Sequence, residues 1–129
     1  MFYPVKYVNY LVTTMTVTQA YQSILVQPQG RLDLQGGKAL EKQLINLVAN
    51  AQALLSVDLA HVDFMDSSGL VALARCLKVA RQNGCRLVLC NLQAPVKLIF
   101  ELTQLDAVFE IFDNYDAVLT TVEKVKVVA

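Results

Sequence analysis

Short, strongly apolar segments alternate with stretches of helical periodicity in this chain of 129 residues, and this alternation constrains the fold most tightly. Leu54 to Leu59 and Arg86 to Asn91 are typical of buried strands, and Leu70 to about Asn83 between them has the apolar spacing of a helix. Strands joined by a helix-length crossover pair in parallel, with a right-handed connection. Elements buried on both faces also account for the hydrophobic content of 55%, which exceeds the roughly 45–50% usual for soluble domains.

The remaining segments continue this alternation. Two β-branched segments predict an early hairpin, and Gly30 to Gly37 predicts a loop before the next helix. The predicted elements are strands over Thr14–Tyr21, Ser23–Gln29 and Val108–Phe112, a short segment at Phe64-Met65, and helices over Lys38–Ala51, from Ala94-Pro95 onward, and from Asn114 or Asp116 to about Val125. The expected fold class is α/β, with a mixed, mostly parallel sheet of about four to five strands and about four helices.

The length predicts one domain. Four of the first ten residues are Phe or Tyr, and Pro4 stands among them. This segment is open to three interpretations: a disordered tail, an upstream translation artefact with Met15 as the true start, or a docking strip. We expect an irregular N-terminal leader over residues 1–13, followed by a single domain over residues 14–129.

Composition argues against several classes of function. With 11 basic and 11 acidic residues, the chain lacks the basic excess of a general nucleic-acid binder. It has no apolar run long enough to span a membrane and no signal peptide, so we expect a cytoplasmic location. Cys76, Cys85 and Cys90 lack metal-ligand spacing and suit small buried side chains in a reducing compartment. We therefore expect neither a metal site nor a cofactor.

Charge is unevenly distributed along the second half of the chain. Ser67 to Lys97 contains five cations and no acid, whereas Glu101 to Glu123 contains six acids and no cation. This segregation is explained either by two differently solvated faces or by a polarised docking surface. Arg75 and Lys78 lie off the predicted buried stripe of their helix, so we expect them to contribute to partner docking. That stripe comprises Leu70, Leu73, Ala74, Leu77 and Ala80.

Asp66-Ser67-Ser68-Gly69 is the most informative motif, because it lies between a strand and a helix. Asp or Ser at this place is a helix N-cap, which contributes about 1 kcal/mol. Gly69 costs stability in a helix, and it would leave Ser68 uncovered for the approach of another protein. A catalytic serine needs a base, but His61 is the only histidine and no G-x-S-x-G elbow is present. We therefore do not expect an enzyme.

Modification is the remaining use of an exposed serine at a helix start. A phosphoserine adds about −1.5 to −2 charge, which the helix dipole tolerates at this end. A partner that presents carboxylates to the same surface would be repelled by several kcal/mol. If the preceding strands are neighbours, Asp33 lies near these serines. Phosphate would then add charge to an already acidic patch.

The motif resembles a known signature. Phe64 to Leu70 is similar to the signature of bacterial anti-sigma factor antagonists, the STAS-domain family. The similarity extends over about Thr14 to Lys124 and includes other family motifs in the right order. These are Gly30-Arg31-Leu32-Asp33, Gly84 to Cys90, Ala94-Pro95-Val96 and Phe100-Glu101-Leu102.

The resemblance implies a STAS fold and a partner-switching mechanism. The unmodified protein would bind an anti-sigma factor that is also a serine kinase, phosphorylation would release it, and a metal-dependent serine phosphatase would reset it. Carried over, the acceptor is Ser68. Asp66, Ser67 and Gly69 belong to the switch loop, and Asp33 lies on the same surface.

Two residues depart from the family pattern. Val71 stands where many relatives have glycine, and Gln104 stands where a Thr-Gly-Leu turn is common. The first alters the predicted contact face of the helix. An alternative function within the same fold is a non-switching structural STAS subunit of a transporter or signalling assembly.

Overall fold

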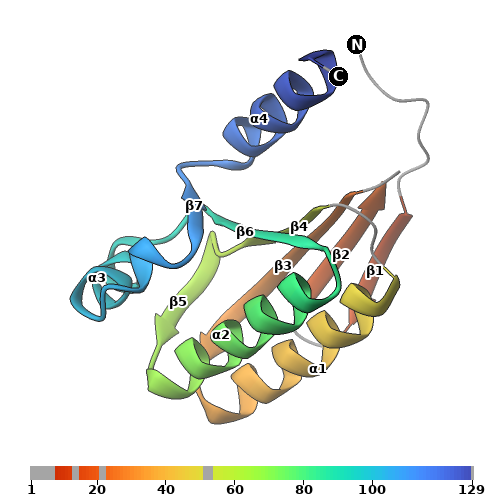
Figure 1. Cartoon of the computed structure of the whole chain (residues 1–129). Coiled ribbons are helices and arrows are strands. Elements are labelled where there is room, and N and C mark those ends of the chain that lie inside the picture. Colours follow the sequence, from red (N-terminus) through yellow and green to blue (C-terminus); the bar gives the residue numbers. More distant parts are fainter. Residues whose placement is uncertain (1–7, 13–14, 21–22, 51–53, 129) are drawn as a thin grey trace.

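A mixed β-sheet organises the molecule, shown as a computed structural model in Figure 1. The structure describes residues 8–12, 15–20, 23–50 and 54–128. The strands are β1 (Val8–Val12), β2 (Met15–Ala20), β3 (Ser23–Leu32), β4 (Leu54–Asp58), β5 (His61–Met65), β6 (Arg86–Cys90) and β7 (Glu110–Phe112). The helices are α1 (Leu34–Asn50), α2 (Ser67–Gln82), α3 (Ala94–Leu102) and α4 (Tyr115–Val128), with a 3₁₀ turn η1 (Leu105–Ala107).

Within the described residues the strand order is β1-β2-β3-β4-β6-β7, and β5 pairs separately with β3. The pairs β3–β4, β3–β5, β4–β6 and β6–β7 are parallel, whereas β1–β2 and β2–β3 are antiparallel. Helices α1 and α2 lie side by side over one face of the sheet (Figure 1). The expectation of a mixed, mostly parallel α/β sheet with four helices is confirmed, but the described residues form seven strands rather than the expected four to five, because residues 8–12 add β1 and β5 is a separate strand after β4.

The core lies between the sheet and these two helices. All five residues of β4 are buried, which confirms the predicted central strand. Helix α1 buries Leu40, Leu44 and Val48, whose four-residue spacing places them on one face of the helix. On α2 the stripe is confirmed except at Ala74, which is exposed; Ala72 and Cys76 occupy the buried face instead. A smaller cluster on the other side of the sheet contains Leu54, Val88, Cys90 and Val118.

Strand β3 changes its partner along its length. Its first part pairs with β4, and Gln29 to Leu32 pair with β5. The register shifts at Gly30, whose φ of 89° is a left-handed conformation that suits glycine. The predicted loop over Gly30–Gly37 is therefore wrong at both ends, since the strand continues to Leu32 and the helix starts at Leu34.

The N-terminal expectation also needs correction. Residues 8–12 form strand β1 and pair with β2 in the antiparallel register Val8↔Gln19 to Val12↔Met15. They are therefore not an irregular leader, because their backbone groups continue the hairpin of β2 and β3. Residues 1–7 and 13 lie outside the described part of the chain, as does the turn at Gln22.

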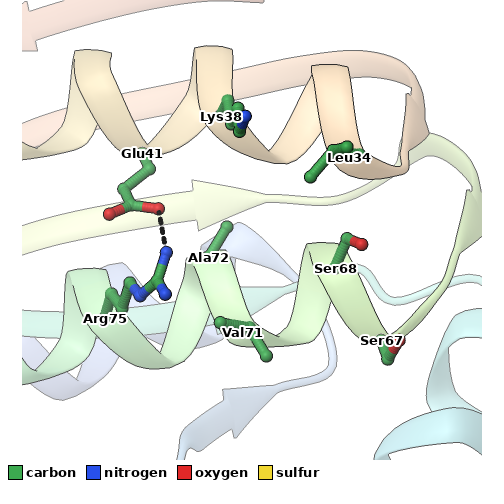
Figure 2. A pocket seen from close by; sticks show the side chains of 8 residues that line it. All are labelled: Leu34, Lys38, Glu41, Ser67, Ser68, Val71, Ala72 and Arg75. Atoms are coloured by element: carbon green, nitrogen blue, oxygen red, sulfur yellow. Dashed lines mark ion pairs between the residues drawn. The ribbon is translucent and has the colours of Figure 1, made fainter.

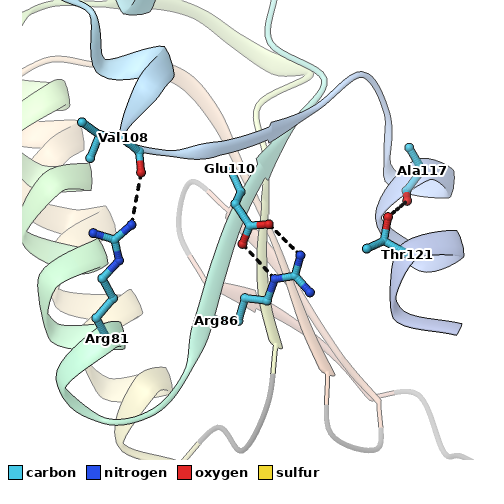
Figure 3. Close-up of polar contacts among 6 residues, drawn as sticks. All are labelled: Arg81, Arg86, Val108, Glu110, Ala117 and Thr121. Carbon is cyan, nitrogen blue, oxygen red and sulfur yellow. Dashed lines mark hydrogen bonds and ion pairs between the residues drawn. The ribbon is translucent and has the colours of Figure 1, made fainter. Parts of the chain in front are cut away.

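Part of the charge segregation is explained by pairing within the fold (Figure 3). Strands β6 and β7 are parallel neighbours, so Arg86 reaches Glu110 in a two-bond ion pair with N–O distances of 2.8 and 2.6 Å. This contact raises the pKa of Arg86 and lowers that of Glu110. Arg81 donates to the Val108 carbonyl oxygen at 3.2 Å.

Cys76, Cys85 and Cys90 are buried free thiols. Burial raises the pKa of Cys76 and of Cys90 to about 12, with smaller contributions from Glu41 and Asp58 respectively. Thiols in this state are poor nucleophiles and poor metal ligands at neutral pH. In the part of the chain that the structure describes, no helix has the length and apolar character needed to cross a membrane.

Leu73 tests the packing of α2. Its side chain is fully buried between α2 and the sheet, so Leu73→Ala should lower the free energy of unfolding by about 2–5 kcal/mol. Val71→Ala, on the exposed side of the same helix, should change it by less than about 0.5 kcal/mol. Urea unfolding measures both, and equal effects of the two changes would contradict this assignment of faces.

Candidate functional site

Two neighbouring parallel strands each lead directly into a helix. Strand β3 ends at Leu32 and α1 begins at Leu34, while β5 ends at Met65 and α2 begins at Ser67. The backbone N–H of Asp66 bonds to the Leu32 carbonyl, which ties the two strand ends together. The starts of α1 and α2 therefore lie side by side at the carboxyl edge of these strands.

Each helix start is held by an aspartate immediately after its strand. Asp66 Oδ1 accepts hydrogen bonds from the backbone N–H groups of Ser68 at 2.9 Å and Gly69 at 3.3 Å. Asp33 Oδ1 accepts from Gly36 N–H at 3.0 Å. The bond from Gly36, assisted by Arg31, lowers the pKa of Asp33. These bonds satisfy amide groups that a helix start otherwise leaves unpaired.

Two glycines allow the helix starts to pack closely. A Cβ on Gly69 would overlap the Leu32 backbone oxygen and lie 2.9 Å from Leu32 Cβ. A Cβ on Gly37 would lie 3.2 Å from both the Ser68 carbonyl oxygen and Ala72 Cβ. The expectation that Gly69 leaves an open surface is therefore wrong. Gly69 is buried, and a residue without a side chain is needed there because the end of β3 lies against it.

Beside this contact, a hollow of about 220 Å³ lies between α1 and α2 (Figure 2). Ser68 lines it from the first turn of α2, opposite Leu34 on α1. Leu34 and Val71 are large apolar side chains that are 58% and 47% exposed, so the hollow has an apolar rim. The complete lining is Leu34, Lys38, Glu41, Ser67, Ser68, Val71, Ala72 and Arg75.

The hydroxyl groups of Ser67 and Ser68 are available for chemistry. Asp66, not a serine, caps α2, and the structure gives neither hydroxyl a hydrogen-bond partner among the described residues. Ser67 is exposed and Ser68 is partly exposed. An incoming group can therefore reach Ser68 without breaking the cap.

The charges around Ser68 are mixed rather than acidic. Arg75 Nη1 lies 3.5 Å from Glu41 Oε1, which links α2 to α1 across the hollow (Figure 2). Lys38 also lines the hollow, and no carboxylate of the described residues pairs with it. The expected acidic patch is not found, because Glu41 is the one carboxylate among the residues that line the hollow, against the cations Lys38 and Arg75, and Asp33 lines a different hollow.

That second hollow, about 520 Å³, lies along the end of β3 and the start of α1. Asp33 pairs there with Arg31 at 3.6 Å, and the Arg31 guanidinium lies 3.9 Å from the centre of the Phe64 ring. The structure thus brings Asp33 to the neighbouring helix start, as predicted from neighbouring strands, but does not place it in the hollow of Ser68. Lys78 is exposed further along α2.

The geometry does not support serine catalysis. His61 is the first residue of β5 and the serines follow its last, so roughly 13 Å of strand separates them at about 3.3 Å per residue. Within the described ranges, no three His, Cys, Asp or Glu side chains gather to hold a metal ion.

Several lining residues were missing from the site predicted from sequence. Leu34 fell inside the predicted loop, and Lys38 and Glu41 lay in a predicted helix to which no site residue was assigned. None of these three residues belongs to a local motif. These residues could have been found only by considering the two strand–helix units together. When neighbouring parallel strands each lead into a helix, the first turns of the two helices must lie close to one another.

Comparison with known proteins assigns this architecture. The model of the STAS domain matches residues 14–118. The chain belongs to the STAS domain family. This STAS domain is 27% identical over 103 residues to an anti-sigma F factor antagonist of Paenibacillus polymyxa, with 79% of this chain and 88% of the relative covered. That name describes a regulator rather than an enzyme, as the sequence led us to expect.

Solved structures share the fold. An anti-sigma factor antagonist from Mycobacterium paratuberculosis is 25% identical, with a TM-score of 0.67 and coverage of 92% of this chain and 94% of that one. The Bacillus cell fate determinant SpoIIAA in its phosphorylated form is 15% identical, with a TM-score of 0.60 and coverage of 90% and 99%. The predicted STAS fold is confirmed.

Gly69→Ala tests the close approach in this STAS domain. Helix propensity alone would stabilise the protein by roughly 0.5–1 kcal/mol. Because the new Cβ meets the backbone of Leu32, we expect instead a net loss of about 1–3 kcal/mol in urea unfolding. Ser68→Ala, one residue earlier and partly exposed, is the control; a stabilised Gly69→Ala protein would contradict the packing.

Proposed function

We propose that this STAS domain is an anti-sigma factor antagonist that acts by partner switching at Ser68. The unphosphorylated form binds an anti-sigma factor that is a serine kinase. Phosphorylation of Ser68 releases that partner, and a metal-dependent serine phosphatase restores the binding form. The three buried free cysteines suit the reducing cytoplasm, where we place this cycle.

One observation carries the proposal: Ser68 stands at a capped helix start and lines an apolar-rimmed hollow, and its hydroxyl has no hydrogen-bond partner among the described residues. A kinase can modify such a hydroxyl without unfolding the helix. The exposed Leu34 and Val71 side chains give a partner apolar area to bury next to the modified atom.

The surroundings of Ser68 explain why phosphate would weaken partner binding without unfolding the domain. The amide groups and dipoles of two parallel helix starts lie near Ser68, so added negative charge is tolerated by the folded domain. A phosphate on the rim also blocks close approach and imposes a desolvation penalty on any partner that covers it. Modification therefore lowers partner affinity more than it lowers stability.

Val71 is expected to adjust partner specificity. It is exposed on the hollow one turn from Ser68, at a position where many family members have glycine. A larger apolar side chain there enlarges the rim and requires a complementary recess on the partner.

Ser68 variants test the switch. We expect Ser68→Ala to bind the kinase partner and accept no phosphate, and Ser68→Asp to lose part of the affinity because it carries less charge than phosphate. Stoichiometric phosphorylation should weaken binding by about a thousandfold, equivalent to ~4 kcal/mol. Calorimetry with the cognate kinase, and mass spectrometry to locate the phosphate, provide the measurements.

Ser67→Ala is the matched control for Ser68→Ala. Ser67 lines the same hollow but its hydroxyl takes no part in the cap, so this variant should still bind and still accept phosphate. Phosphate on Ser67 alone would refute the site assignment. Undiminished kinase binding by the Ser68 phosphoprotein would refute the switch and favour a structural STAS subunit.

Surface cations on α2 should steer the partner. We expect reversal of Arg75 and Lys78 to glutamate to slow association and to reduce its salt dependence, while the unfolding free energy changes by no more than about 1 kcal/mol. Stopped-flow association at several salt concentrations measures this effect. Lys97→Glu, an exposed change on α3, is the control, and identical rates for all variants would remove Arg75 and Lys78 from the interface.

A further inference from the structure

We propose that Lys38 holds the phosphate on Ser68 across the hollow, so that phosphorylation forms an ion pair between α1 and α2. This inference rests on Ser68 being the modified residue of the proposed function. It assigns to a side chain of the neighbouring helix the role of stabilising the modified state.

Backbone packing places Lys38 close to Ser68. Gly37 lies directly against the Ser68 carbonyl and Ala72, and Lys38 is the next residue along α1. Figure 2 shows Lys38 one helical turn beyond Leu34, which lies opposite Ser68. Both Lys38 and Ser68 line the same hollow, and a lysine has a flexible four-carbon stem that can bring its ammonium group to an added phosphate.

Lys38 is also the cation of this hollow that has no carboxylate partner among the described residues. Arg75 is paired with Glu41, and it lies seven residues beyond Ser68, about 10 Å along the helix axis at ~1.5 Å per residue. A phosphate on Ser68 therefore meets Lys38 without displacing an existing ion pair. The pair formed is charge-assisted and satisfies phosphate oxygens that would otherwise face only solvent.

The net charge of the hollow changes sign on phosphorylation, and this change links the Lys38 contact to the proposed switch. Before modification the hollow carries two cations, Lys38 and Arg75, and one anion, Glu41. The phosphate adds about −1.5 to −2 charge and makes the hollow net negative. Lys38 offsets part of that charge and is thereby withdrawn from the surface that the unmodified protein offers to a partner.

The second pKa of the Ser68 phosphate, measured by phosphorus NMR titration, tests the contact. Phosphoserine is incorporated at position 68 during translation, so no kinase is needed. Other charged groups near the phosphate are Glu41, Arg75 and the capping carboxylate of Asp66. We expect Lys38→Gln to raise this pKa by about 0.5, the effect of one exposed charge roughly 5 Å away in water.

Two further variants make the outcome decisive. Lys42→Gln removes an exposed cation one turn further along α1, outside the hollow, and should leave the phosphate pKa unchanged. An unchanged pKa in Lys38→Gln, or a rise only in Arg75→Gln, would overturn the assignment of Lys38. Kinase binding by the same phosphoproteins is measured separately, so loss of the proposed switch and loss of the Lys38 contact are distinguished.

Discussion

Close backbone packing at the starts of α1 and α2 determines how these two helices lie against each other and against the end of β3 in this STAS domain. Gly69 lies against the Leu32 carbonyl, and Gly37 lies against the Ser68 carbonyl. Side chains at either position would push α1 and α2 apart or away from the strand ends. The hollow next to Ser68 exists because the helices meet this closely at their starts while Leu34 and Val71 remain outside the contact.

The two aspartate caps leave the serines of the proposed switch without a structural role at the helix start. Asp33 and Asp66 occupy equivalent places after neighbouring strands, and each satisfies amide groups of its own helix. Consequently, the serines that follow Asp66 are not needed to start α2. A hydroxyl that is partly exposed, unpaired in the described structure and not needed for the cap is available for reversible modification. If the modified serine were itself the cap, phosphorylation would remove the capping hydrogen bond and the domain would lose stability.

The elements that local pattern determines were predictable, and those that long-range contacts determine were not. The central strand from Leu54 and the α2 helix follow from apolar spacing and from the Asp66 cap. The extension of β3 to Leu32 depends on pairing with β5, whose residues lie far along the sequence. For the site, Ser68 and its cap were visible as a local motif. Lys38 and Leu34 were not, because their role arises from the side-by-side packing of two helices.

The fold shows which of the unevenly distributed charges are paired within the protein and which remain available to a partner. Of the cations between residues 67 and 97, Arg81 and Arg86 bind groups on the segment around β7, and Arg75 pairs with Glu41. On the α2–β6–β7 side these cations are therefore bound within the fold, and are neither held on a separately solvated face nor left free for a partner. What remains for docking is a smaller set: Lys38, beside apolar side chains in the Ser68 hollow, and Lys78, exposed further along α2. A partner matched to this surface must combine carboxylates with an apolar contact, and a phosphate at its centre opposes both.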